Sequence, residues 1–340
     1  MMSEVNIVRS LPETEWRRFI EHNPHSSIFH TPEMFEVFAH TKGNRPTLWA
    51  AVNESGHTLA LLLPVQITLR EGLMHNLTTR AIVFGSILWE QGNDGERAVA
   101  LLLKTYSEKT DGAPLFTEMR NLWDINAILS STFQEQGFIY EEHLNYLIDL
   151  DRSFDAIFSA FNAGTRKKIR RGLNRGDVIV EEVKELEQVA VCYDLLVKTY
   201  KNAHVPLADR SLFETAFNIL YPKGMVRFTL ARVGDAFVAT SIELLYKDMV
   251  YGWYGGSDRA YSSYVPNELV ISNILQWGAE KGYRVYDFGG AGKPNQEYGV
   301  RDFKAKFGGA LVCFGRYTYI HNPFLLQVST LGYEIARKFF

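Results

Sequence analysis

Apolar and polar residues recur with two different periods along the first 150 residues, and this predicts a mixed α/β arrangement. Ser10, Pro12 and Glu13 have the spacing of a capping box with a proline just inside, so a helix is expected to start there. A second start is expected at Thr31 and Pro32. The same patterns predict helices over 94–109 and 122–136 and strands over 46–52, 58–69, 81–88, 114–119 and 137–150.

The second half of the chain repeats this order of strands and helices. Gly234-Asp235 and Lys247-Asp248 predict tight turns between strands, and Pro266 opens a helix expected to end at Gly282. The tail from 321 to 340 is amphipathic and predicts a closing helix. Further helices are expected over 153–174, 185–203 and 211–221, and strands over 177–183, 226–233, 236–246, 249–256, 283–290 and 310–319.

Length and composition restrict the class of protein. A chain of 340 residues is long enough for two domains or lobes, and 46% hydrophobic residues exclude global disorder. Net charge is −3, from 36 Lys and Arg against 39 Asp and Glu, so the whole surface does not suit non-specific coating of nucleic acid. Any anion site must therefore be local.

Cysteine count and apolar runs bear on the compartment. Cys192 and Cys313 are far apart and form no CxxC pair, which favours neither a disulfide framework nor a cysteine zinc site. The first residues have no apolar leader core, and runs such as 59–65 are far shorter than the ~20 residues that span a bilayer. We expect a cytoplasmic protein without stable membrane insertion.

The densest run of cations lies between 165 and 175. Ile169 and Leu173 have helical spacing and are expected to face inward together, which leaves the cations on the solvent side. No acidic residue lies between Asp155 and Asp177 to pair with them. A solvated helix face and a site for a phosphate-bearing ligand both remain open. The cations are Arg166, Lys167, Lys168, Arg170, Arg171 and Arg175.

A glycine-rich segment at 286–309 begins with Asp287 at an expected strand end, where α/β proteins gather functional groups. Its Asp-Phe-Gly does not indicate a kinase, because the HRD and VAIK elements are absent. Gly292-Lys293 is followed by Pro294, so it is no Walker loop. The glycines alone are equally typical of tight turns and close packing.

Other common sites are not indicated. His22, His25 and His30 lie in an expected loop without a metal-binding motif, so we expect no metal. No G-x-S-x-G elbow marks a nucleophile. Aromatic residues in 250–256 favour a packed strand, although a tyrosine there could line a cleft.

Taken together and in this order, the segments resemble the FemABX family. The resemblance covers most of the chain. It is carried by IFHTPEMFEVF (28–38), LPVQ (63–66), TEMR (117–120), EQGFIYEEHLNYLIDL (135–150), FNAGTRKKIRRGLNRG (161–176), the long segment 250–290, which ends in YDFGG, and YGVRDFKAKFGG (298–309).

The resemblance implies an α/β fold of two tandem lobes, each similar to the GNAT acyltransferase fold with a mixed, mostly antiparallel sheet, and without a coiled-coil insertion. The lobes are expected at 1–150 and 151–320, followed by the closing helix at 321–340. The second lobe is expected to hold the basic helix and the catalytic cleft. The implied activity is transfer of an aminoacyl or acyl group onto an amine of a cell-wall or cell-envelope precursor.

The resemblance also implies roles for single residues. Phe303 and Lys304 are similar to the family's Phe-Lys pair near the donor terminus, where a cation stabilises a developing oxyanion. Tyr254 is similar to a cleft tyrosine. Arg210 is a weaker match to an arginine that contacts an acceptor phosphate. The expected substrate-binding cations are Arg166, Lys167 and Arg170 of the basic helix.

Three departures from the family pattern concern the substrates. Phe38 stands where murein-type members often have a lysine for a nucleotide-sugar acceptor, and Lys42 is only a nearby substitute. The helical hairpin that some members use for tRNA is absent. Arg259 is followed by AYSSYVP instead of the glycine-rich loop with which GNAT enzymes hold the coenzyme A pyrophosphate, which disfavours acetyl-CoA in the usual mode.

The reaction needs a proton acceptor, and Asp287 is our candidate, with capping of the following loop as the alternative role. No tightly bound cofactor is expected, with aminoacyl-tRNA or acyl-CoA as co-substrate. Aminoacyl-tRNA is the favoured donor. The alternatives are an N-acyltransferase that uses acyl-CoA on a polysaccharide or glycolipid precursor, and a non-catalytic module that binds RNA or a phosphorylated glycan.

Overall fold

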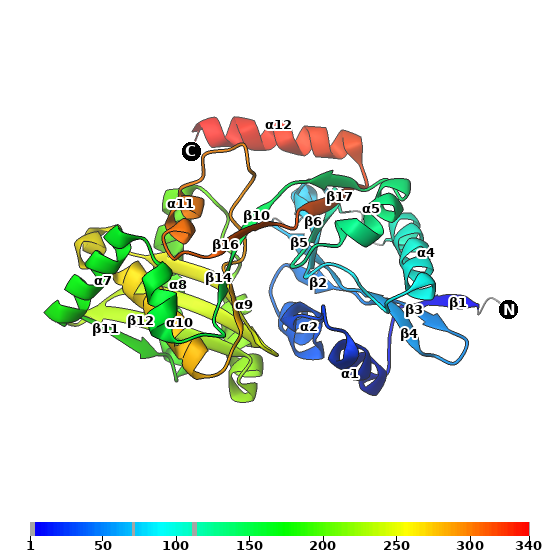
Figure 1. Cartoon of the computed structure of the whole chain (residues 1–340). Helices are drawn as coiled ribbons and strands as arrows, with labels where there is room; N and C mark the ends of the chain where they lie inside the picture. The colour runs from blue at the N-terminus through cyan, green and yellow to red at the C-terminus, as the bar shows by residue number, and fades with distance from the viewer. Residues whose placement is uncertain (1–3, 70–71, 111–113, 340) are drawn as a thin grey trace. The chain divides into compact units, whose positions relative to one another are not determined.

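The structure of the chain is a computed structural model that describes residues 4–69, 72–110 and 114–339 (Figure 1). The chain divides into two units. Unit 1 is formed by Met1–Glu142 together with Phe314–Phe340, and unit 2 is formed by His143–Cys313. In the described ranges, no helix combines the length and the apolar character needed to cross a membrane.

Unit 1 contains two sheets, with strand orders β1-β3-β4-β7 and β2-β5-β6-β8-β17-β9. Its strands are β1 (Val5–Val8), β2 (Asn44–Pro46), β3 (Trp49–Asn53), β4 (Thr58–Leu62), β5 (Pro64–Thr68), β6 (Thr79–Phe84), β7 (Leu88–Trp89), β8 (Phe116–Arg120), β9 (Ile139–Glu141) and β17 (Arg316–Ile320). Its helices are α1 (Glu13–His22), η1 (Ile28–His30), α2 (Pro32–Ala39), η2 (Gly72–Met74), α3 (His75–Thr78), α4 (Asn93–Lys109), α5 (Asn126–Glu135) and α12 (Pro323–Phe339).

Helix α4 illustrates how the sequence builds the core of unit 1. Its buried residues Ala98, Leu102 and Tyr106 are spaced by four, so they form one stripe along the helix. The stripe packs into a cluster with Trp49 and Leu62 from the sheet. Burial of each such large side chain contributes about 1.5–3 kcal/mol.

Unit 2 has one seven-stranded sheet in the order β11-β12-β13-β14-β15-β10-β16. Its strands are β10 (Leu144–Asp149), β11 (Val178–Glu182), β12 (Val226–Val233), β13 (Ala236–Tyr246), β14 (Met249–Ser257), β15 (Val285–Asp287) and β16 (Ala310–Cys313). Its helices are α6 (Phe154–Ala160), α7 (Ala163–Arg175), α8 (Leu186–Ala203), α9 (Arg210–Leu220), η3 (Tyr221–Lys223), η4 (Arg259–Tyr264), α10 (Pro266–Glu280) and α11 (Gly299–Ala305).

Each unit takes one strand from beyond the expected domain limits. β10 lies between β15 and β16 in the sheet of unit 2, and β17 lies between β8 and β9 in unit 1. The chain therefore changes unit after Glu142 and again after Cys313, whereas the sequence placed these limits at 150 and 320. The mixed α/β class and the two sheet-rich, helix-flanked parts expected from the sequence are confirmed.

Three single strands expected from the sequence are each divided between two sheets. The segment 58–69 forms β4 and β5, 137–150 forms β9 and β10, and 310–319 forms β16 and β17. In 58–69 the apolar run continues from β4 into β5, and most of both strands is buried. The local pattern therefore carries no sign of the change.

Two helix starts also differ from expectation. α1 begins at Glu13 with Pro12 as its N-cap and without a side-chain cap, so the box expected at Ser10 does not form. The helix expected over 153–174 is interrupted at Asn162, whose side chain accepts a hydrogen bond from the Thr165 N–H at 2.7 Å and starts α7 anew. The starts expected at Thr31–Pro32 and Pro266 are confirmed.

The buried face of α7 was predicted only in part. Ile169 is fully buried, but Leu173 is 66% exposed. The inward position is taken instead by Gly172, where an added Cβ would lie 3.1 Å from Leu269 and 3.4 Å from Val265. The helix approaches α10 too closely at this point to accommodate a larger residue.

We predict that Gly172→Val destabilises the chain by about 1–3 kcal/mol, because the new side chain must separate α7 from α10. Leu173→Val is the matched control on the exposed face and should change the free energy of unfolding by less than about 0.5 kcal/mol. Urea unfolding followed by circular dichroism measures both. Equal stability of the two variants would contradict the assigned face.

Candidate functional site

The site is placed by a parallel pair of strands that is very short. β14 and β15 pair only from Met249 opposite Val285 to Tyr251 opposite Asp287. Beyond this point β14 continues along β13, and none of the described strands pairs with the edge that had faced β15. The carboxyl ends of a parallel pair thus diverge and leave room between them.

A β-bulge lies at the same place. Ile242 pairs with Tyr254 and Glu243 pairs with Gly252, so Trp253 is an extra residue in β14. A bulge bends the strand and increases its local twist, which turns β14 away from β15. The bulge and the end of the parallel pair together open the sheet.

A cavity of about 510 Å³ occupies this opening, and all its lining residues belong to unit 2. This volume is in the range of small-molecule sites. The lining combines backbone-rich glycine segments of β14 and the 289–290 turn with polar side chains and Lys304. Aromatic rings line it as well, among them Tyr200, Trp253, Tyr254, Phe288, Tyr298 and Phe303.

Two glycines allow the strands to approach closely before they diverge. An added Cβ at Gly252 would lie 2.7 Å from the Tyr286 hydroxyl, and one at Gly289 would lie 2.6 Å from the Gly252 carbonyl oxygen. Gly289 also has φ of 75°, which other residues rarely adopt. These two glycines of the sequence pattern are therefore required by packing.

Asp287 lies fully buried behind the cavity lining. Its Oδ1 accepts hydrogen bonds from the Asn145 side-chain amide and from the Gly289 N–H, both at 2.6 Å. Asn145 in turn accepts from the Gly290 N–H at 2.9 Å, so the turn is tied to β10. Burial raises the pKa of the Asp287 carboxyl, and the two hydrogen bonds and Lys304 oppose the rise. These are the contacts of a loop cap.

Lys304 comes from α11 and lines the cavity next to the 288–290 turn. Its ammonium donates hydrogen bonds to the carbonyl oxygens of Phe288 and Gly290. Burial lowers the pKa of Lys304 to about 8, and the charge of Asp287 opposes this lowering. An ammonium has three N–H donors, so one remains for a ligand in the cavity.

Of the residues singled out in the sequence, Tyr254, Phe303 and Lys304 line the cavity. Arg210 does not: it begins α9, is half exposed, and makes a 2.7 Å ion pair with Glu214 one turn later. The helix spacing of Arg210 and Glu214 explains this pairing.

The cations of α7 also lie outside the cavity lining. Arg166 donates hydrogen bonds to the carbonyl oxygens of Ser159 and Phe161 and so caps the end of α6. Arg170 lies 5.3 Å from the Phe158 ring centroid. Lys167, Lys168 and Arg171 are exposed. The resulting positive face is thus smaller than the sequence suggested.

Glu243, a fully buried acid in β13, was not among the residues predicted from the sequence. The only signal was one charged residue within the apolar run AFVATSIELLY of 236–246. A lone charge in a strand is usually a solvent-facing position, because strands alternate between faces. Only the position of β13 inside the sheet shows that this residue is buried.

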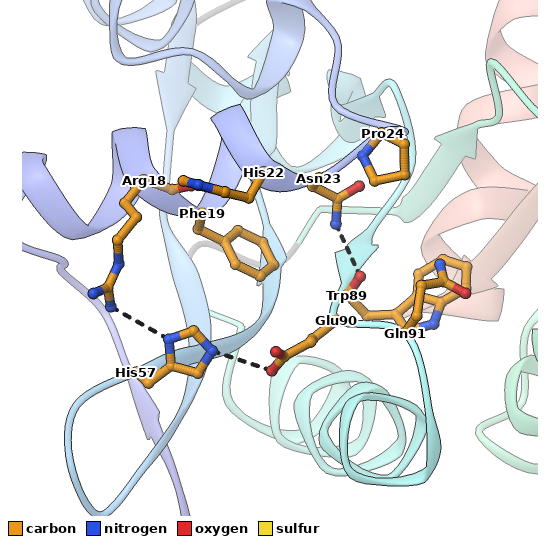
Figure 2. A pocket seen from close by; sticks show the side chains of 9 residues that line it. All are labelled: Arg18, Phe19, His22, Asn23, Pro24, His57, Trp89, Glu90 and Gln91. Carbon is orange, nitrogen blue, oxygen red and sulfur yellow. Dashed lines mark hydrogen bonds and ion pairs between the residues drawn. The ribbon is translucent and has the colours of Figure 1, made fainter.

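A second cavity of about 410 Å³ lies in unit 1 at the end of α1 (Figure 2). At its rim, Nδ1 of His57 lies 3.3 Å from Nη2 of Arg18, and Nε2 of His57 lies 3.1 Å from Oε2 of Glu90. All three side chains are exposed. Beside the cavity, His25 stacks on Trp123 with ring centroids 3.5 Å apart. Among the residues with described positions, no group of three or more His, Cys, Asp or Glu is arranged to hold a metal ion.

Comparisons with known proteins agree with this fold. Residues 159–304 match the family model described as an acetyltransferase (GNAT) domain. This segment contains α7, the bulged β14, the 287–290 turn and Lys304. The transferase class predicted from the sequence motifs is confirmed by this match and by the names of the similar proteins.

Two curated proteins are similar to this chain at low identity. The UDP-N-acetylmuramoylpentapeptide-lysine N(6)-alanyltransferase of Weissella viridescens is 23% identical over 52% of this chain, and the match spans 57% of that protein's length. The lipid II:glycine glycyltransferase of Staphylococcus saprophyticus is 22% identical over 68% of this chain and 71% of that protein. The crystal structure of FemX superposes with a TM-score of 0.72 at 15% identity, over 95% of this chain and 99% of FemX.

We predict that Asn145→Ala destabilises unit 2 by about 1–3 kcal/mol, because it leaves the buried Asp287 carboxyl with one partner fewer. Asn174→Ala, on the exposed side of α7, is the control and should change stability by less than about 0.5 kcal/mol. Thermal unfolding of both variants measures the difference. If the two midpoints agree, Asn145 does not clamp the turn.

Proposed function

Since the chain is FemABX-like in its motifs, relatives and fold, we propose that it transfers an aminoacyl group from aminoacyl-tRNA onto an amine of a cell-envelope precursor. The observation that carries this proposal is Lys304, a partly buried cation at a cavity that opens where β14 and β15 diverge. Such a cavity suits an activated carbonyl, whose oxygen becomes negative during attack by an amine.

The reaction follows from the donors around the cavity. Two N–H groups of Lys304 are held by the carbonyls of Phe288 and Gly290, which fixes the third. A fixed donor in a buried site stabilises the tetrahedral oxyanion without having to reorganise. Phe303 and Tyr254 supply rings against which the acyl group packs. Lys304 remains largely protonated at neutral pH, because its pKa is about 8.

The segment before α10 favours a tRNA donor over coenzyme A. Backbone N–H groups of a glycine-rich loop would bind a pyrophosphate here, but this chain forms the short helix η4 instead. The N–H of Tyr261 donates to Asp258 and that of Val265 donates to Ser262, so both are used within the segment. Pro266 at the first position of α10 has no N–H to offer.

The acceptor is an amine on an envelope precursor, as in the names of the two curated relatives. This acceptor binds differently from the acceptors of family members that have a lysine in α2. Phe38 is buried and stacks on Phe84 with centroids 5.3 Å apart, and the Arg120 guanidinium lies 5.3 Å from the Phe84 centroid. Aromatic packing thus replaces a cation at this position.

The main alternative is transfer from an acyl-CoA to a polysaccharide or glycolipid precursor. It is supported by the description of the matched family model, and it uses the same Lys304. A non-catalytic module that binds RNA or a phosphorylated glycan is supported only by the exposed cations of α7. The two experiments below separate these possibilities.

We predict that Lys304→Met lowers kcat by about 10²–10³, the usual loss when one oxyanion donor is removed. The apparent affinity for donor and acceptor should change little, because the lost interaction belongs to the transition state. Transfer from alanyl-tRNA to a UDP-linked muropeptide is the assay. Lys306→Met is the matched control, since Lys306 lies two residues on and outside the cavity lining. Full activity of Lys304→Met would refute the role.

We predict that charged tRNA raises the melting temperature of the chain and that the effect weakens as salt increases. The triple variant Lys167→Gln, Lys168→Gln, Arg171→Gln should lose most of this stabilisation. The control variant loses three positive charges on α4, at Arg97, Lys104 and Lys109. It should be stabilised by charged tRNA as much as the wild type is. Stabilisation by coenzyme A thioesters alone would favour the acyl-CoA alternative.

A further inference from the structure

A buried acid of unit 2 lies one side chain away from the cavity. Glu243 is 0% exposed, and it lies in β13 opposite Arg227 of β12 and Gly252 of β14. It does not line the cavity itself. Ser241 precedes it by two residues, so both side chains leave the same face of the strand. Ser241 does line the cavity.

The hydroxyl of Ser241 connects the acid to the cavity. Its Oγ donates a hydrogen bond to Oε1 of Glu243. Oε2 of Glu243 is buried and has no hydrogen-bond partner within the described part of the chain. An unpaired buried carboxylate oxygen costs folding free energy, and Oδ2 of Asp287 is in the same position. What distinguishes Glu243 is the Ser241 hydroxyl, which connects its carboxylate to the cavity. This arrangement suits a group that exchanges a proton.

The groups around Glu243 leave it able to titrate. Arg227 is opposite, but its ion pair is with Glu182 at 3.2 Å, and its guanidinium lies 4.3 Å from the Trp277 ring centroid. Burial raises the pKa of Glu243 to about 8, and the Ser241 hydrogen bond and the charge of Arg227 oppose this rise.

The remaining neighbours are neutral near pH 7. Tyr286, on β15, and Cys192, on α8, both interact with Glu243. Burial raises the pKa of the Cys192 thiol to about 12 and that of the Tyr286 hydroxyl well above its usual value. Neither group competes with Glu243 for a proton near neutral pH.

Asp287 is less suited to accept a proton from a ligand. It too is absent from the cavity lining, and its Oδ1 accepts hydrogen bonds from Asn145 and the Gly289 N–H. Its Oδ2 is buried without a hydrogen-bond partner in the described residues, as Oε2 of Glu243 is. The hydrogen-bond donors to Asp287 in the described residues are a side-chain amide and a backbone N–H, and neither is a hydroxyl that lines the cavity. Glu243 differs because the Ser241 hydroxyl reaches both the carboxylate and the cavity.

Resting on the proposed function, we propose that Ser241 accepts the proton of the attacking amine while its own hydroxyl proton passes to Glu243. Ser241 is then the residue that contacts substrate, and Glu243 is a positioning residue that acts through it. The sequence motifs did not point to either residue.

The proposed step balances as follows. The neutral amine nitrogen forms a bond to the carbonyl carbon, and the oxygen becomes an oxyanion beside the Lys304 ammonium. The nitrogen then bears an extra proton, which passes through Ser241 to Glu243. The C–N bond remains, the C–O bond to the tRNA ribose breaks, and the released oxygen takes a proton from water. Glu243 returns its proton to solvent before the next cycle.

The experiment compares pH profiles of kcat for the wild type, Glu243→Gln, Ser241→Ala and Ser241→Thr, with alanyl-tRNA and UDP-linked muropeptide as substrates. We expect kcat of the wild type to rise with pH as Glu243 ionises and to fall again above about pH 8 as the Lys304 ammonium loses its proton. In Glu243→Gln and Ser241→Ala, kcat should no longer rise with pH and should be about 10²–10⁴-fold lower, with KM nearly unchanged. Ser241→Thr keeps the hydroxyl, so its kcat should still rise with pH as in the wild type. Glu181→Gln is the control, because Glu181 lies on β11, which β12 separates from β13.

A second measurement does not depend on activity. The folded pKa of Glu243 lies above the ordinary 4.5, so its contribution to stability is complete below about pH 4.5 and is lost as pH rises through about 8. The difference in unfolding free energy between wild type and Glu243→Gln should therefore follow this course. A difference independent of pH would show that Glu243 does not titrate, which overturns the inference.

The outcomes separate the two proposals. A wild type that transfers from no donor overturns the proposed function and this inference with it. A wild type that transfers, together with a Glu243→Gln or Ser241→Ala variant that keeps the rate and its rise with pH, overturns only the inference. A Glu243→Gln variant that fails to fold leaves Ser241→Ala and Ser241→Thr to decide.

Discussion

The three residue pairs over which β14 and β15 run parallel are the constraint on which the site depends. Up to Tyr251 and Asp287 the two strands share one sheet, and beyond them the bulge at Trp253 turns β14 away. Gly252 and Gly289 allow the approach, and the Asn145–Asp287 hydrogen bond fixes the turn from which Lys304 takes its two carbonyl partners. A longer pairing would close the cavity, and a shorter one would leave the turn without its anchor.

This opening in the sheet brings three ionisable groups into surroundings that disfavour their charges. Burial raises the pKa of Asp287 and Glu243 and lowers that of Lys304. Each shift marks a loss of solvation that a purely structural sheet would avoid with apolar side chains. Asp287 recovers part of the loss through its hydrogen bonds, and Lys304 through two carbonyls. Glu243 has a single hydrogen bond, to Ser241, so it is the least compensated of the three.

Local sequence signals predicted the elements well where a cap or turn residue marks them, as at Thr31–Pro32 and Pro266. They failed where strands change sheets, since an apolar run such as 58–69 reads the same in one sheet as in two. Family resemblance placed Tyr254, Phe303 and Lys304, which line one cavity. It also suggested Arg210, which pairs with Glu214 instead. Glu243 was not predicted, because its burial depends on sheet neighbours far along the chain.

The exchanged strands also determine the order in which the chain completes its parts during synthesis. The sheet of unit 1 needs β17 between β8 and β9, and β17 leaves the ribosome after all of unit 2. Unit 2 has its last strand, β16, a few residues earlier, so the unit that starts second is the first to be complete. Until β17 arrives, β8 and β9 present open edges to other nascent chains. In folded unit 2, Leu144 of β10 pairs with Cys313 of β16, so the two chain ends that lead back to unit 1 lie side by side and the loop that β17 must close is short.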